Sequence, residues 1–245
     1  MTQPLRLRAN PGLKQRRVSE LGERAGPAAA ADAREQLEDA QVLGSLELAG
    51  CRFGWEEVRA ARRGAGGALE IVGLQRAQAA LDPAAAFRAG HLLEWHRAAL
   101  GGGALRTATR DREGGPPPAP PELIAGRLEI LEQWLSAASA TELAPAQAGA
   151  LVMARVLEIA PFDDGNGRVA RLAASHLMLR AGGRPPVLVG ADAPRLRAAV
   201  EAAFRLDTEP LASLLEEAGL RSFDVLLQAL ESHLRGKEPD AGGRT

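Results

Sequence analysis

The amino-acid sequence predicts a fold built from α-helices. The 245-residue chain is rich in Ala, Leu, Arg and Glu, which favour helices, and its 46% hydrophobic content suffices for one substantial core. From Val169 to Arg180, mostly apolar residues recur at the 3.6-residue period of a helix. Clusters of glycine and proline divide the rest of the chain into segments of helical length.

The N-terminal part is expected to hold a leader followed by helices. Residues 1–32 are polar, with a Gly26-Pro27 break and an alanine run, and we expect a flexible leader. Residues 33–84 are predicted to be a helical segment that breaks at Gly64 to Gly67. A run of glycine and proline from Gly114 to Pro121 is predicted to be an extended loop.

The C-terminal half continues the helical pattern. Ala146 to Ile159 is predicted to be a helix, and Gly182-Gly183 ends the helix that begins at Val169. Pro194 opens the next helix from its first turn. Residues 219–235 hold a last helix, capped by Ser222, whose apolar face could pack on the core or on a second subunit as a homo-oligomer; a polar tail, 236–245, follows.

One segment carries the residue types that hold a nucleotide phosphate. Asp163 to Gly167 joins two predicted helices, and Gly165 and Gly167 let a ligand approach the backbone at a helix N-terminus, where free N–H groups favour an anion. Arg168 and Arg171, three residues apart, share one helix face and suit several phosphate oxygens. Asp164 offers a hard oxygen ligand for Mg²⁺ beside those phosphates.

A second interpretation of this segment stays open at this point. Asp-Gly and Asn-Gly pairs are ordinary turn formers, and surface arginines are common. Two cations at a helix N-terminus oppose the helix dipole, however, so a structural role alone explains Arg168 and Arg171 poorly.

The segment resembles the signature loop of Fic proteins, H-x-F-x-D/E-G-N-G/K-R-x-x-R. Residues 160–171 read A-P-F-D-D-G-N-G-R-V-A-R and match every fixed position except the first, where Ala160 replaces histidine. Helices at Leu92–Arg97, Leu131–Leu135 and Arg195–Leu215 look like others of the family. The resemblance implies an all-α, Fic-type domain with its core at residues 85–218.

The resemblance also implies a reaction and roles for the residues. Fic proteins transfer AMP from Mg·ATP to a Ser, Thr or Tyr hydroxyl of a target protein. By this likeness Asp164 would hold Mg²⁺, and Phe162 would anchor the loop. The residues that would contact or neutralise the phosphates of ATP are Gly165, Asn166, Gly167, Arg168 and Arg171. Leu105, Arg106 and Thr107 resemble a short β-hairpin flap that positions the target.

Ala160 separates the expectation of binding from that of catalysis. A methyl group cannot accept a proton, and a positioned general base contributes about 10²–10⁴-fold in rate. His91, His96, His176 and His233 are the histidines of the chain, and none is a convincing replacement; His176 is expected to be a core residue. We therefore expect nucleotide binding with impaired AMP transfer, and the alternative is an inactive nucleotide-binding regulator or protein-interaction module, a pseudoenzyme.

An upstream segment resembles the inhibitory helix of many Fic proteins, S/T-x-x-x-E-G/N. Glu47 stands where the inhibitory glutamate would be, with Leu43 and Leu48 at the other two motif positions. Two interpretations are open: Glu47 pairs with Arg171, or Glu47 is an ordinary solvated helix residue.

Composition excludes several other classes of function. A net charge of −1 argues against a nucleic-acid-binding protein, and with 3% aromatic residues base stacking is not expected. Cys51 is the single cysteine, so neither a disulfide nor a cysteine zinc site can form within one chain. With no apolar run of membrane-spanning length, we expect a cytoplasmic protein whose partners are a nucleotide and a target protein, not a membrane.

Overall fold

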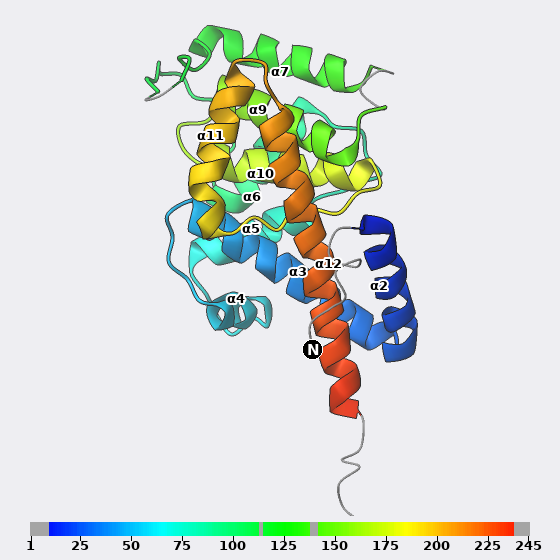
Figure 1. Ribbon diagram of the computed structural model, residues 1–245. Helices are drawn as coiled ribbons and strands as arrows, with labels where there is room; N and C mark the ends of the chain where they lie inside the picture. Colours follow the sequence, from blue (N-terminus) through cyan, green and yellow to red (C-terminus); the bar gives the residue numbers. More distant parts are fainter. Residues whose placement is uncertain (1–9, 113–114, 138–141, 238–245) are drawn as a thin grey trace, which may run out of the picture.

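The computed structural model describes residues 10–112, 115–137 and 142–237, and within them it is helical (Figure 1). Three parts of the predicted organisation lie outside the described residues. They are the leader up to residue 9, Gly114 of the loop, and the tail from residue 238. The elements are α2 (Pro11–Ala25), α3 (Pro27–Leu48), α4 (Trp55–Arg62), α5 (Leu69–Ala79), α6 (Ala89–Leu100), α7 (Pro121–Leu135), α9 (Pro145–Ile159), α10 (Asn166–Arg180), the 3₁₀ turn η1 (Gly190–Asp192), α11 (Ala193–Phe204) and α12 (Glu209–Lys237).

Helices α9 and α10 form the centre of the fold. Small residues let the two helices approach closely: a Cβ added to Gly149 would lie 2.8 Å from Met178, and both helices bury several alanines. Around this pair lie α6, α7, α11 and α12, as Figure 1 shows. Because α9 and α10 are adjacent in sequence and in space, the loop between them is fixed at both ends by buried helices.

The residues expected to form a flexible leader are helical from position 11. Helix α2 and the first half of α3 pack on α12 through a second apolar cluster, which includes Leu21, Leu37 and Leu227. The buried ammonium group of Lys14 donates to a carboxylate oxygen of Asp224 on α12 at 2.6 Å. The leader prediction was wrong for residues 11–32 because α12 supplies a partner surface that local sequence does not show.

Helix α12 is also longer than expected. We predicted a separate helix near Ser222, but the helix runs unbroken from Glu209 to Lys237. Glycine in a helix interior costs about 1 kcal/mol relative to alanine. The helix nevertheless continues through Gly219, where an added Cβ would lie at an ordinary van der Waals distance of 3.5 Å from Met178 and from the carbonyl oxygen of Arg184.

The predicted β-hairpin flap is wrong: the described part of the chain contains no strand. From Gly101 to Arg112 the backbone is irregular, and the N–H of Arg106 donates to the carbonyl oxygen of Pro161 at 2.9 Å. Side chains from this segment, rather than a second strand, hold it in place.

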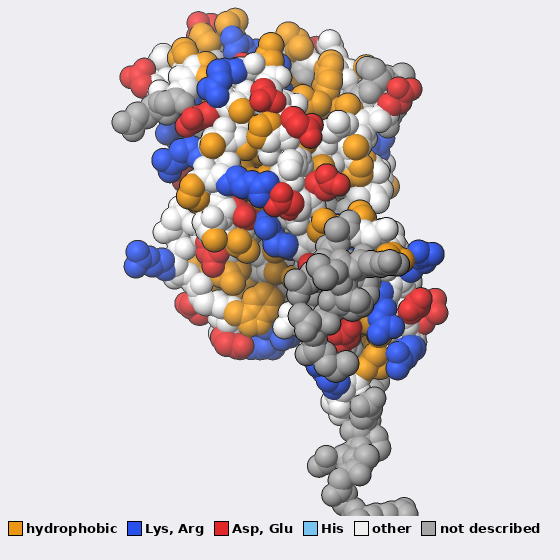
Figure 2. All heavy atoms as spheres, in the orientation of Figure 1, with side chains coloured by type: hydrophobic (Ala, Val, Ile, Leu, Met, Phe, Trp, Pro, Cys, Tyr) orange, Lys and Arg blue, Asp and Glu red, His pale blue; other side chains and the backbone are white. Residues whose placement is uncertain are grey.

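The surface is of mixed charge, and the helices are not of the membrane-spanning kind within the described residues. The face in Figure 2 mixes acidic and basic side chains without a large area of one sign. None of the helices within the described ranges is long and apolar enough to cross a membrane.

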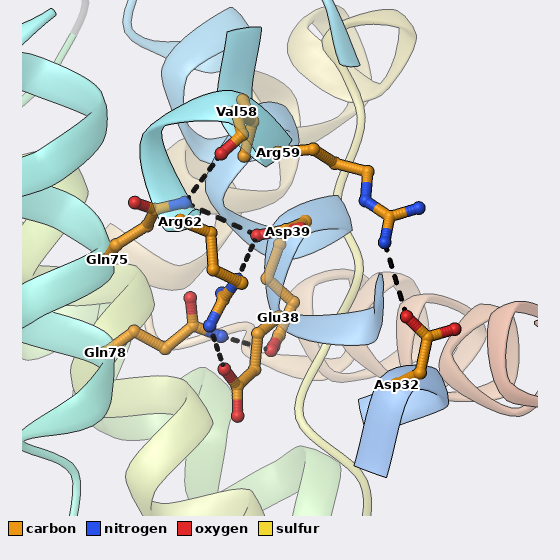
Figure 3. A network of polar contacts seen from close by, with 9 residues as sticks. Asp32, Glu38, Asp39, Val58, Arg59, Arg62, Gln75 and Gln78 are labelled. Carbon is orange, nitrogen blue, oxygen red and sulfur yellow. Dashed lines mark hydrogen bonds and ion pairs between the residues drawn. The ribbon is translucent and has the colours of Figure 1, made fainter. Parts of the chain in front are cut away.

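A polar network joins α3, α4 and α5 (Figure 3). Asp39 on α3 is 1% exposed and accepts from Nε of Arg62 on α4 at 2.6 Å and from Gln75 on α5 at 3.4 Å. Glu38 accepts from the same guanidinium at 2.9 Å. A buried carboxylate needs such partners, so Arg62 fixes α4 against α3.

Replacing Arg62 should therefore destabilise the fold. Arg62→Met leaves the buried Asp39 without its cation, which costs about 3 kcal/mol. The control Arg59→Met removes only a half-exposed pair with Asp32 at 3.3 Å, worth about 1 kcal/mol or less. Urea unfolding of both variants measures the difference, and equal losses would contradict a special role for Arg62.

A buried histidine predicts a loss of stability in acid. His176 on α10 is 0% exposed and packs against the rings of Trp95, His91 and Phe87 at 5.4, 5.7 and 6.3 Å. Burial lowers its pKa to about 4, and the charges of His91 and Arg180 add to the lowering. The folded state thus keeps the ring neutral, while the unfolded chain protonates it below its ordinary pKa of about 6.5.

The free energy of unfolding should consequently fall as the pH drops from about 6.5 to 4. The contribution of His176 to this fall is up to about 3 kcal/mol. His176→Phe keeps an aromatic ring and removes the titration, so its unfolding free energy should depend less on pH in this window. Urea unfolding of both proteins across the window tests this, and parallel curves would assign the acid sensitivity to other groups.

Candidate functional site

The loop between α9 and α10 owes its path to two residues with positive φ. Helix α9 ends at Ile159, and Ala160 follows with φ 47°, its N–H bonded to the carbonyl oxygen of Val156 at 2.9 Å. Gly165 precedes α10 with φ 74°. A Cβ at Gly165 would lie 2.2 Å from Leu100, so only glycine fits there. Ala160 has a Cβ and carries the strain of this conformation.

Asn166 and Phe162 brace the loop from within. The Asn166 side chain accepts from the Phe162 N–H at 2.9 Å and donates to the Phe162 carbonyl oxygen at 2.7 Å. The Phe162 ring is fully buried, as expected for an anchor. Since both polar atoms of the Asn166 side chain bond to the backbone, this residue shapes the loop; its predicted contact with phosphate stays a prediction.

His96 supports the loop from α6, which the sequence did not indicate. Its ring stacks on Phe162 at 3.9 Å between centroids, and its Nε2 lies 3.1 Å from the carbonyl oxygen of Asp164. A carbonyl only accepts, so Nε2 carries the proton. Burial lowers the pKa of His96, which keeps the ring neutral, and the buried Nδ1 has no partner among the described residues. A lone histidine on a helix gives no sequence signal for this contact.

Three arginines after α6 hold the other side of the loop. Arg106 is 2% exposed and donates from Nε to the carbonyl oxygen of Ala160 at 2.7 Å, and also to Ile159 and Ala119. Arg110 donates to the carbonyl oxygens of Phe162 and Asp163. Arg112 donates to Leu157 and Glu158, and lies over the Phe204 ring. Arg106 and Arg112 thus satisfy carbonyls that the end of α9 leaves unpaired, and Arg110 satisfies carbonyls of the loop itself.

The three residues predicted to position a target, Leu105, Arg106 and Thr107, differ in their exposure and in their hydrogen bonds. Arg106 is buried and fully occupied by backbone carbonyls, so it fixes the loop. Thr107 is exposed and Leu105 is half-buried. A role of these residues in holding a target stays a prediction.

Arg171 is a partly buried cation without a carboxylate partner among the described ion pairs. Its Nε donates to Oγ of Ser45 and its Nη2 to the Ser45 carbonyl oxygen, both at 2.8 Å. Burial lowers its pKa to about 10, and the charge of Arg168 adds to this. Nη1 would lie 3.2 Å from a Cβ at Gly167, so the guanidinium lies against the first turn of α10.

Arg168 and Asp164 lie at the rim of the same helix end. Arg168 donates to Oδ2 of Asp164 at 2.9 Å, and the Asp164 side chain is 83% exposed. In the described part of the chain, no three His, Cys, Asp or Glu side chains gather as a metal site. Asp164 thus offers one carboxylate to a cation that would draw its other ligands from phosphates and water.

Of the two interpretations of Glu47, the pairing with Arg171 is not present among the described residues, and the Glu47 side chain is exposed. Its carboxylate accepts from the backbone N–H of Gly190 at 2.7 Å, while Ser45, two residues earlier on α3, holds Arg171. A Cβ on Gly44 would lie 1.7 Å from the Leu188 carbonyl oxygen, so α3 lies directly on the chain before η1. This contact directs Glu47 toward η1; inhibition by Glu47 stays a prediction.

The loop lies within a segment that matches a family model. Residues 86–178 match the model of the Fic/DOC family. Protein adenylyltransferase Fic of Drosophila grimshawi is 38% identical over 104 residues, which are 40% of this chain and 21% of that protein. The Drosophila virilis protein of the same name is 30% identical over 144 residues, 56% of this chain and 30% of that protein. The chain spans less than a third of the length of these curated relatives.

Solved structures agree in fold. Fic-1 (residues 134–508) from C. elegans has a TM-score of 0.74 at 19% identity, covering 90% of this chain and 74% of that one. A Fic domain containing signaling protein from Bacteroides thetaiotaomicron has a TM-score of 0.75 at 18% identity, covering 90% and 97%. These likenesses show that the chain has a Fic-type fold, and residues 86–178 match the model of the Fic/DOC family.

Proposed function

We propose that the chain binds the phosphates of Mg·ATP at the N-terminus of α10 and that its transfer of AMP to a target hydroxyl is impaired. The observation that carries the proposal is Arg171, a partly buried guanidinium that lies against the first turn of a helix without an acidic partner among the described residues. A cation that is partly removed from water without a compensating charge favours the binding of an anion. Helix N-terminal N–H groups favour the same anion.

The remaining phosphate groups would be met by Arg168 and the loop backbone. Arg168 is nearly buried and its partner Asp164 is exposed, so a phosphate can replace that carboxylate while Asp164 turns to Mg²⁺. Bound there, Mg²⁺ would neutralise phosphate charge. Gly167 adds no Cβ between the first turn of α10 and Nη1 of Arg171, which keeps the backbone there open to the ligand.

Transfer would form a bond between the target hydroxyl oxygen and the α-phosphorus of ATP. The bond from that phosphorus to the β-phosphate oxygen breaks, pyrophosphate leaves, and the hydroxyl proton needs an acceptor. Ala160 offers a methyl group that is 7% exposed. Phosphate binding uses other residues and survives this substitution, whereas proton removal does not. The names of the relatives, protein adenylyltransferase, support this choice of reaction.

The alternative is a nucleotide-binding regulator or protein-interaction module without transfer activity. It is favoured by the combination of Ala160 with retained Arg168, Arg171 and Asp164. The ion pair between Asp164 and Arg168 lies at an exposed rim and contributes little to the free energy of folding. A role in ligand binding therefore explains these two residues better than a role in stability. A target protein, a homo-oligomer and a cytoplasmic location stay predictions under both proposals.

Calorimetry with Mg·ATP should show binding that depends on Arg171. Arg171→Ala removes charge-assisted hydrogen bonds worth about 1.5–3 kcal/mol, so the dissociation constant should rise by about tenfold or more. The control Arg155→Ala removes an arginine on α9 that pairs with Glu158 at the surface, and affinity should not change. Absence of binding in the unaltered chain, or equal binding by all three proteins, would contradict the proposal.

Transfer should return when the base is supplied. With α-labelled ATP and a cell lysate, Ala160→His should label protein about 10²–10⁴-fold faster than the unaltered chain. Glu47→Gly is tested alone and combined with Ala160→His. Faster labelling on removal of Glu47 would indicate inhibition by this residue, whereas faster labelling with the histidine alone would indicate loss of the base. Equal labelling with and without the histidine would mean that another group removes the proton. No labelling in any of these proteins would contradict transfer and favour the binding role.

A further inference from the structure

A cleft of about 400 Å³ lies between α5 and α6 beside the loop. Asp164 and Arg168 line its end at the loop, and Arg76 and Arg97 line its walls from α5 and α6. Leu69 and Val72 add an apolar wall, and Leu69 is 86% exposed, the highest value among the large apolar side chains of the described residues. Cations and an apolar surface thus meet directly beside the loop that carries Ala160.

Arg76 and Arg97 are exposed, and neither belongs to an ion pair among the described residues. The Arg97 side chain is placed by its neighbour: a Cβ at Gly103 would lie 3.1 Å from both Cβ and Nε of Arg97, so the side chain lies along this glycine. Arg168 and Asp164 neutralise each other, and Glu70 is the remaining acid of the cleft. Two arginines against one glutamate leave the cleft with an excess of positive charge.

The proposed phosphate site and the cleft meet at Arg168 and Asp164, which line the end of the cleft at the loop. The third residue of that site, Arg171, lies beside a different small cavity, which is lined from α5 by residues other than Arg76. Arg76 and Arg97 have no role in the proposed phosphate site, so they remain free for another ligand next to a bound nucleotide.

We infer that this cleft docks an acidic segment of the target protein next to the loop. Guanidinium groups pair with carboxylates through two hydrogen bonds, which gives orientation as well as attraction. An apolar residue of the same segment would cover Leu69 and Val72, since exposed apolar surface beside cations is typical of interaction sites. The inference rests on the proposed function, because it supplies the substrate preference of that reaction.

The test uses a fluorescein-labelled peptide in which glutamates flank a leucine and a serine, and a matched peptide with glutamine in place of glutamate. Fluorescence anisotropy should show that the unaltered chain binds the acidic peptide more tightly than the neutral one. The double variant Arg76→Glu/Arg97→Glu should weaken that binding by about tenfold or more. Arg127→Glu, an exposed arginine on α7 outside the cleft, is the control and should keep binding within about twofold.

Mg·ATP calorimetry on the same double variant separates the two proposals. Unchanged ATP affinity with lost peptide binding supports a docking cleft distinct from the phosphate site. A parallel loss of ATP affinity would overturn the inference by making the cleft part of the phosphate site. Equal binding of the two peptides, or peptide binding that survives the double variant, also overturns the inference. This holds whatever effect Arg171→Ala has on the affinity for ATP. The milder Arg76→Gln/Arg97→Gln variant should also lose peptide binding. Thermal melting of both double variants, followed by circular dichroism, checks that each is folded and excludes misfolding as the cause.

Discussion

The capping of the α9 C-terminus by arginine side chains is the interaction on which the candidate site depends. A helix leaves its last carbonyls without partners, and here Arg106, Arg110 and Arg112 donate to carbonyls from Leu157 to Asp163. Because a guanidinium donates several hydrogen bonds in fixed directions, these side chains hold irregular backbone that no strand or helix supports. The chain can then turn at Ala160 and enter α10 with its N–H groups directed to one place.

The opposite side of the site depends on α3. Ser45 accepts two hydrogen bonds from the partly buried Arg171 but carries no negative charge, so the cation is held in position without being neutralised. Close contact at Gly44 fixes the rotation of α3, and the network around Asp39 and Arg62 ties α3 to α4 and α5. The position of Arg171 therefore depends on residues more than a hundred positions away in sequence.

Position 160 combines a backbone role with a proposed side-chain role. The backbone role, ending α9 in a left-handed turn, is fulfilled by alanine with some strain. Under the proposed function, proton transfer would need a side chain that alanine lacks, whereas the residues proposed to hold phosphate come from the loop and α10 and keep their positions with alanine at the end of α9.

The sequence by itself determined the helical class, the loop between two helices and its match to the Fic family, because periodicity, glycine positions and a long motif are local properties. It did not determine the partners of Arg106, His96 or Glu47, because these contacts join segments that only the packed fold brings together. The expected flap strands, and the flexible leader as far as residues 11–32, were wrong for the same reason. Arginine–carbonyl bonds replace strand pairing in one case, and the surface of α12 orders residues 11–32 in the other.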